Sequence, residues 1–178
     1  MINIIGQLFG IGAMAFLFSV YQQTNRKKLI FNKLCADFCW VIHYLLIGAY
    51  GGMIPNFVGI FRELVFAKRD EKKWARHIIW PVFFVTVNWI LGISTFKSAI
   101  NILPIAASAF ATISLWCKNT NITKMILVPV CIAFLIYDIA VGSWIGIINE
   151  SISLLSVIIY YITEFGGKYG RKKFNQKR

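Results

Sequence analysis

The sequence predicts an all-α membrane protein with seven transmembrane helices, arranged as two parallel three-helix repeats and a linker helix (3+1+3). We expect the N-terminus to lie outside the cytoplasm and the C-terminus inside it. Of the 178 residues, 58% are hydrophobic and the mean hydropathy is +0.66, which is more apolar surface than a soluble core of this size can hide. In addition, basic residues gather in alternate breaks between apolar runs, and the second half of the chain repeats features of the first.

The apolar runs approach the roughly 20 residues that a helix needs to cross a bilayer. The expected helices span residues 2–22, 29–49, 53–67, 78–93, 98–117, 125–141 and 144–165. The first run begins MINIIG and lacks the basic start of a cleavable signal peptide, so we expect it to remain as the first helix.

The basic residues predict the orientation of these helices. All Lys and Arg residues except Lys97 fall into clusters at 26–33, 62–76, 118–124 and 168–178, which alternate with breaks that are almost free of charge. Because basic loops remain in the cytoplasm, this alternation places the N-terminus outside and the C-terminus inside. The net charge of +12 therefore indicates topology, and we expect no nucleic-acid partner, whose phosphates would require a clustered basic surface.

The two halves of the chain match at an offset of 94 residues without gaps. This offset places Ala13, Ala15, Phe16, Asn25, Ile42, Gly48, Gly52 and Ile54 on Ala107, Ala109, Phe110, Asn119, Ile136, Gly142, Gly146 and Ile148. A repeat of three helices, an odd number, needs one intervening helix if both copies are to point the same way. We therefore predict a first repeat at 1–67, a basic loop and linker helix at 68–96, a second repeat at 97–166 and a basic cytoplasmic tail at 167–178.

Parallel repeats of this kind occur in transporters, whose binding site lies between the repeats near the membrane midplane. The offset pairs Asn56 with Glu150, which lies roughly 9 Å inside the membrane at about 1.5 Å per residue. Ionisable residues at such depth are costly and are functional candidates. We therefore predict that Asn56, Glu150 and the neighbouring Asn149 bind a small polar solute. The alternative is an interhelical hydrogen bond that only holds the bundle together.

A second candidate group is a polar or proton relay. Asp37 lies roughly 12 Å inside its helix and must face protein or a cavity. His43 and Asp138 belong to the outer ends of the second and sixth helices, and histidine can serve as a proton carrier or simply pack at the interface. In contrast, we expect Arg62 and Glu63, near a cytoplasmic helix end, to snorkel or to pair with basic loops.

Aromatic residues form a third candidate group. Trp40, Tyr50 and Trp144 could stack on a ring-shaped solute. The alternative is that they only anchor the protein at the membrane interface, where aromatic residues are enriched.

Enzyme chemistry finds no support in the sequence. There is no GxSxG, P-loop, GxGxxG or HExxH motif. Cys35, Cys39, Cys117 and Cys131 lie in or beside apolar segments without metal-ligand spacing. We therefore expect no catalytic residue, cofactor or metal.

Three stretches carry a family resemblance: SVYQQTNRKKLIFNKL, WVIHYLLIGAYGGMIPNFVGIFRELVF and VGSWIGIINESISLLSVIIY. Over nearly its whole length the chain resembles the small YgjV-type bacterial inner-membrane proteins and, beyond them, the superfamily of SWEET sugar transporters, PQ-loop proteins and PnuC-type vitamin transporters. The resemblance implies a multi-pass protein of the bacterial inner membrane that transports a small solute. The chain departs from the PQ-loop pattern because it has Tyr21, Gln22 and Gln23 in place of a Pro-Gln pair.

An alternative hypothesis is a non-transporting membrane protein that binds a partner or anionic lipid through its basic loops. Each Lys or Arg near an anionic surface contributes about 1 kcal/mol. A polar cavity in the middle of the bundle would favour transport, and a dry bundle would favour the alternative. The sequence leaves open the identity of the solute and whether the protein is a homo-oligomer.

Overall fold

The computed structural model describes residues 4–22, 26–94, 96–117 and 120–175, which form seven α-helices and two short 3-10 helices and contain no β-strand. The α-helices are α1 Ile4–Gln22, α2 Arg26–Leu46, α3 Tyr50–Ala67, α4 Ile79–Ser94, α5 Ile102–Trp116, α6 Thr120–Val141 and α7 Trp144–Asn175. The 3-10 helices are η1 Lys73–Arg76 and η2 Ala99–Asn101. The predicted all-helical fold with seven helices is confirmed. The predicted start at residue 2 lies outside the described residues.

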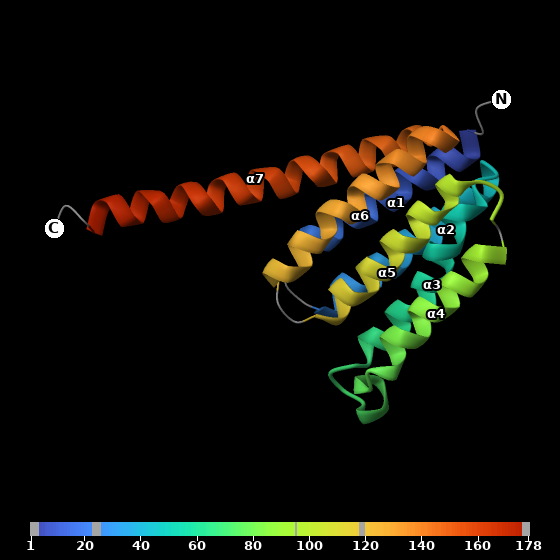
Figure 1. Cartoon of the computed structure of the whole chain (residues 1–178), viewed down its shortest axis with the longest axis horizontal. Coiled ribbons are helices and arrows are strands. Elements are labelled where there is room, and N and C mark those ends of the chain that lie inside the picture. The colour runs from blue at the N-terminus through green and yellow to red at the C-terminus, as the bar shows by residue number, and fades with distance from the viewer. Residues whose placement is uncertain (1–3, 23–25, 95, 118–119, 176–178) are drawn as a thin grey trace.

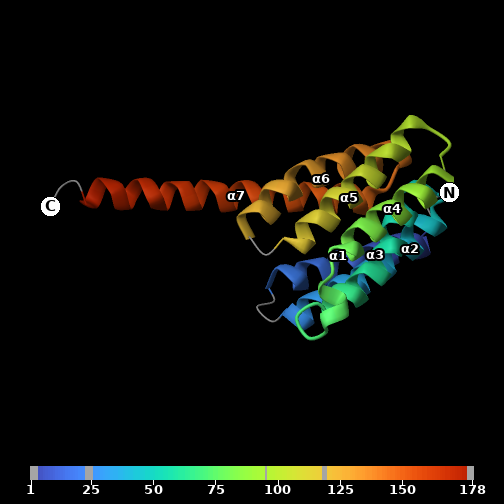
Figure 2. The same ribbon diagram turned by 60° about the horizontal axis from the view of Figure 1, so that its bottom comes forward.

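Six of the helices form a ring. In order around it, α1 packs against α2, α2 against α3, α3 against α5, α5 against α6, α6 against α7, and α7 against α1. The remaining helix, α4, packs against α3 and α5 and lies at one edge of the bundle (Figure 1). Figure 2 shows α1, α2 and α3 on one side of the bundle and α5 and α6 on the other. The ring is therefore closed by the contact between α7 and α1, with α4 outside it.

The distribution of polar side chains is the reverse of that in a soluble protein. Asp37, His43, Arg62, Glu63 and Asp138 are all buried. Large apolar side chains are exposed on every α-helix, and examples are Ile5, Phe38, Phe61, Ile90, Phe110, Ile139 and Leu155. Soluble monomers rarely expose apolar surface on this scale, whereas lipid solvates it. The apolar exterior is thus the surface expected of a membrane protein.

Hydropathy distinguishes the helices. Ala99–Trp116 is the one span among the described residues that is long and apolar enough to cross a bilayer by itself. Shorter apolar helical segments are Ile4–Ser19, Ile79–Ser94, Val128–Val141 and Trp144–Ile159. Neither set includes α2 or α3, which carry the buried charged residues Asp37, Arg62 and Glu63. The helices with the most polar inner faces are therefore the hardest to recognise from hydropathy.

The last helix is longer than predicted. We expected a helix over 144–165 followed by a cytoplasmic tail, but α7 continues to Asn175 and projects well beyond the other helices (Figure 1). This stretch combines Lys and Arg, which fit well in a helix, with three glycines, which disfavour it, so helix preference does not explain the extension. The residues at 176–178 lie outside the described part of the chain.

Two tight turns connect α2 to α3 and α6 to α7 at the same end of the bundle, which we call the turn end. Gly48 and Gly142 have φ angles of 73° and 72°, and the described residues contain no other positive φ angle. The backbone bonds around them correspond at the offset of 94 residues. The Ala49 amide donates to the Tyr44 carbonyl at 2.8 Å, and the Ser143 amide donates to the Asp138 carbonyl at 2.9 Å. The two turns are therefore built in the same way.

Replacing either turn glycine with alanine is expected to lower the free energy of unfolding by about 1 to 2 kcal/mol, because a β-carbon is strained at positive φ. Gly12→Ala is the control, since a β-carbon there would lie 3.8 Å from Cys39 Sγ, an ordinary contact. Thermal unfolding in detergent measures the difference. Equal stability of Gly142→Ala and Gly12→Ala would contradict the geometry of the turn.

Candidate functional site

A cavity of about 130 Å³ lies inside the ring of six helices. Every ring helix contributes to its wall, whereas α4 contributes none of the described residues. The polar lining consists of Lys33, Asp37, Asn56, Arg62, Ser108, Asn149, Glu150 and Ser153, together with Tyr44 and Cys131. An engineered cavity of about 150 Å³ holds benzene, so this space accommodates a small solute.

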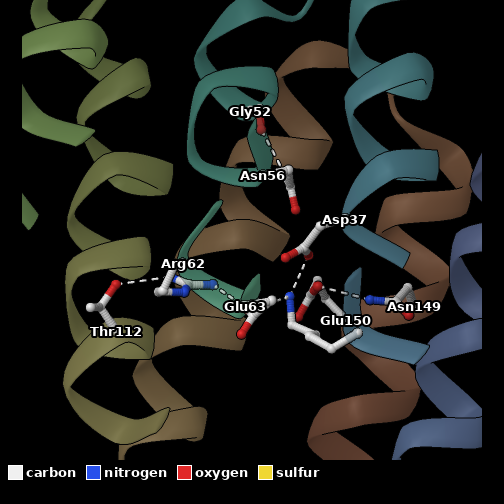
Figure 3. Close-up of polar contacts among 9 residues, drawn as sticks. Asp37, Gly52, Asn56, Arg62, Glu63, Thr112, Asn149 and Glu150 are labelled. Carbon is white, nitrogen blue, oxygen red and sulfur yellow. Dashed lines mark hydrogen bonds and ion pairs between the residues drawn. The ribbon is translucent and has the colours of Figure 1, made fainter. Parts of the chain in front are cut away.

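Asn56 and Glu150, which the offset of 94 residues pairs in the sequence, both line this cavity. Asn56 Nδ2 donates to the Gly52 carbonyl one turn earlier in α3, at 2.8 Å. Figure 3 shows the amide oxygen of Asn56 pointing away from Gly52 and toward Asp37. On α7, Asn149 Nδ2 donates to Glu150 Oε1 at 2.9 Å. Both amides thus direct a donor to the protein, and Asn56 directs its acceptor toward Asp37 on the neighbouring helix α2.

Charged side chains from α2 and α3 meet beside these residues (Figure 3). Lys33 forms an ion pair with Asp37, one turn along α2, and its Nζ lies 3.9 Å from Glu63 Oε1. Arg62 Nη2 donates to the same Glu63 oxygen at 2.9 Å, and Arg62 Nη1 donates to Thr112 Oγ1 on α5 at 2.8 Å. Asp37, Arg62 and Glu63 expose only 1%, 3% and 1% of their surface. The network therefore links α2, α3 and α5 through buried charges.

Gly59 brings α3 close to this network. A β-carbon at Gly59 would lie 2.6 Å from Asp37 Oδ2 and 3.3 Å from Arg62 Nη2. Since the ion pair with Lys33 holds the Asp37 carboxylate, the side chain cannot yield freely. We expect Gly59→Ala to lower the free energy of unfolding by about 1 to 3 kcal/mol through overpacking.

The control for this prediction is again Gly12→Ala, which is also in a helix but in an uncrowded place. Alanine there should be neutral or stabilising by up to about 1 kcal/mol. Thermal unfolding of both variants measures the effect. If both variants behaved alike, Gly59 would not be in close contact with the charged network.

A second polar group, which we call the turn-end network, comprises His43, Tyr44, Tyr137, Asp138 and Ser143. Tyr44 Oη donates to Asp138 Oδ1 at 2.8 Å, and these two residues are 94 positions apart. His43 Nε2 lies 2.8 Å from Ser143 Oγ, and the Gly52 amide donates to Tyr137 Oη at 2.8 Å. Each of these bonds joins α2 or α3 to α6 or the α6–α7 turn. The network thus connects the two halves of the chain at the turn end of the cavity, where Tyr44 is part of the wall.

The structure separates the predicted relay residues into two places. Asp37 lines the cavity, whereas His43 and Asp138 belong to the turn-end network. His43 bonds to Ser143 and to the Gly6 carbonyl, and Asp138 bonds to Tyr44. The three residues therefore do not form a continuous relay in this conformation.

The predicted aromatic residues are also separated. Trp40 is buried and lines the cavity. Tyr50 and Trp144 are 41% and 65% exposed and are not among the residues that line it, and their contact with a solute stays a prediction. The reason for their exposure is local: they are the first residues of α3 and α7, and the preceding glycine turns leave both rings outside the ring of helices. Their position matches that of interfacial anchors.

Comparison with known proteins places the chain in a family. Residues 4–165 match the family Imp-YgjV, described as bacterial inner membrane protein. The chain belongs to this family. It is 25% identical over 149 residues to "Inner membrane protein YgjV" of Escherichia coli (strain K12), which covers 82% of this chain and 78% of that relative. No solved structure matches the chain.

Membership of the Imp-YgjV family places the protein in the bacterial inner membrane. The apolar exterior of the helix bundle agrees with this location. The buried charges are thus held away from lipid, in the part of a membrane protein where ionisable residues mark functional sites.

Sequence reasoning missed the charged part of the site. Arg62 and Glu63 do not snorkel: they are buried and bonded to each other. Lys33 was assigned to a topology cluster, although it lines the cavity. Helical spacing offered a signal, because residues three or four and seven apart lie on one face. Glu63 lies seven residues after Asn56, and Asp37 lies four after Lys33.

Proposed function

We propose that the protein carries a small polar solute across the bacterial inner membrane by alternating access, with the solute bound in the central cavity. The observation that supports this proposal is a cavity with polar and charged walls inside a ring of helices whose outer surface is apolar. Polar groups inside a membrane are costly and mark solute pathways. A bundle that served only as an anchor for basic loops would not require this cavity.

We further propose that α1 to α3 and α5 to α7 are parallel repeats with α4 as their linker, as in the SWEET, PQ-loop and PnuC superfamily. The offset of 94 residues carries the start of α2 at Arg26 to that of α6 at Thr120, and the start of α3 at Tyr50 to that of α7 at Trp144. It also relates the two glycine turns and the bonded pair of Tyr44 and Asp138. Tyr44 and Asp138 would be equivalent positions of the two repeats. Equivalent positions can contact each other when both lie close to the twofold axis that relates the repeats.

The proposed motion is a rocking of the two repeats about the cavity. In this conformation the turn-end network joins the repeats on one side of the cavity. The basic 68–78 loop lies at the opposite end of α3 and α4, and by the positive-inside rule that end faces the cytoplasm. The turn end then faces the periplasm and is closed.

Thermal stabilisation of the purified protein by a panel of sugars, nucleosides, vitamins and amino acids tests this proposal. A ligand at a hundredfold excess over its dissociation constant stabilises the folded state by about 2.7 kcal/mol. We expect at least one solute to raise the midpoint, and we expect Asn56→Ala and Glu150→Gln to abolish that effect. Glu71→Gln, in the exposed 68–78 loop, is the control and should leave it unchanged.

The same solute should enter proteoliposomes that contain the protein and should not enter liposomes without it. If no solute shifts the midpoint while anionic lipid does, the transport proposal fails. The protein would then act through its basic loops on a lipid surface or a partner.

A further inference from the structure

The central cavity and its supporting network contain more carboxyl groups than basic groups. Lys33 is paired with Asp37 and lies near Glu63, and Arg62 is paired with Glu63. Glu150 also lines the cavity, and within the described part of the chain it forms no ion pair. With all five groups ionised, the protein supplies two positive and three negative charges. One negative charge therefore remains without a partner from the protein.

Within the described residues, the hydrogen-bonding groups on the wall include a buried acceptor without a partner, alongside one buried donor without a partner, Arg62 Nε. Asn56 gives an amide donor to Gly52, and Asn149 gives one to Glu150. Asp37 is 1% exposed and lines the cavity, and its Oδ2 has no hydrogen-bond partner. A buried acceptor without a partner costs free energy until a donor reaches it. Asn56 Oδ1 and Asp37 Oδ2 thus offer acceptors to a bound molecule.

The apolar part of the wall fits a cation as well. Trp40 lines the cavity and stacks on Tyr44, with ring centroids 5.5 Å apart. Tryptophan is the aromatic residue that attracts cations most strongly through its ring. The volume of about 130 Å³ limits the occupant to a molecule not much larger than benzene.

We propose that the solute bound in this cavity is a small organic cation with N–H donors, an amine or a guanidinium compound. Its positive charge balances the carboxylate of Glu150, and its N–H groups satisfy Asp37 Oδ2 and Asn56 Oδ1. This inference rests on the proposed solute site and adds the chemical class of the solute. It concerns binding and requires no assumption about the coupling ion.

Pairs of solutes that match in shape and differ in charge test the inference on the unmodified protein. Methylguanidinium and methylurea are such a pair, and measurements at equal ionic strength remove the effect of salt. At a hundredfold excess over its dissociation constant, methylguanidinium should raise the unfolding midpoint by about 5 to 10 °C. Methylurea should produce no shift. Ethanolamine and ethylene glycol form a second pair with the same expected result.

The Glu150→Gln variant should lose the shift by methylguanidinium, and Glu71→Gln should retain it. The inference is overturned if methylurea stabilises as well as methylguanidinium, or if Glu150→Gln retains the full shift. If neutral sugars or nucleosides stabilise the protein and the cations do not, the solute site stands but its charge preference is wrong. If no solute of either kind stabilises it, the proposed transport function fails together with this inference.

Discussion

Replacing Arg62 with methionine is expected to lower the free energy of unfolding by about 3 to 5 kcal/mol, the cost of breaking a buried ion pair. Arg62 is buried and donates to Glu63 at 2.9 Å and to Thr112 at 2.8 Å. Without the guanidinium, the Glu63 carboxylate keeps only Lys33 Nζ, at 3.9 Å, as a cationic partner. A buried carboxylate with so little compensation strongly destabilises the folded state.

A second change should reverse most of this loss. In the double variant Arg62→Met with Glu63→Leu, both charges are gone, and replacing a buried pair by apolar residues is often neutral or stabilising. Lys68→Met, at an exposed position just after α3, is the control for loss of a positive charge and should change little. Thermal unfolding in detergent compares the variants. A loss below about 1 kcal/mol in Arg62→Met would mean that the side chain reaches the headgroups, as the sequence suggested.

The seven-helix fold could be predicted from the sequence because segments that span a membrane are apolar and helical. The predicted apolar segments became the seven helices, although among the described residues only one span is long and apolar enough to cross a bilayer by itself, and glycine marked two of the turns. The end of α7 could not be predicted in this way. Its last residues carry no apolar pattern, and helix preference alone does not decide where a charged helix ends.

The candidate site could be predicted only where a pattern across the whole chain was available. The offset of 94 residues singled out Asn56 and Glu150, and both line the cavity. For an aromatic residue such as Trp144 no such pattern exists, because interfacial anchoring and solute stacking both place an aromatic residue near the end of a helix. Likewise, an arginine near the end of a helix can snorkel or turn inward, and only its packing partners distinguish the two. Arg62 turns inward because Glu63 and Thr112 are there to bind it.

Removing one hydroxyl from the turn-end network should open the cavity on that side. Tyr44 Oη donates to Asp138 Oδ1 between α2 and α6, and leaving a buried acceptor without its donor costs about 1 to 3 kcal/mol. If this bond exists only when the turn end is closed, Tyr44→Phe shifts the equilibrium toward the open state. A change of that size corresponds to roughly a 5- to 150-fold change in population.

Cys131 provides a reporter for this change, because it is buried and lines the cavity. In a background with Cys35, Cys39 and Cys117 replaced by alanine, a membrane-impermeant thiol reagent is applied from the side of the membrane that the turn end is proposed to face. We expect Tyr44→Phe to raise the rate of Cys131 labelling by roughly 5-fold or more. Tyr50→Phe removes the same hydroxyl from an exposed tyrosine at the turn end and should leave the rate unchanged.

The direction of access makes this experiment specific. A loss of stability without gating would expose Cys131 equally from both sides of the membrane, whereas an opened gate exposes it from the turn end alone. Solute at saturating concentration should protect Cys131 in both cases, because the thiol lies on the cavity wall. An unchanged rate in Tyr44→Phe would show that the Tyr44–Asp138 bond persists in both states, and the gate would then have to lie elsewhere in the ring.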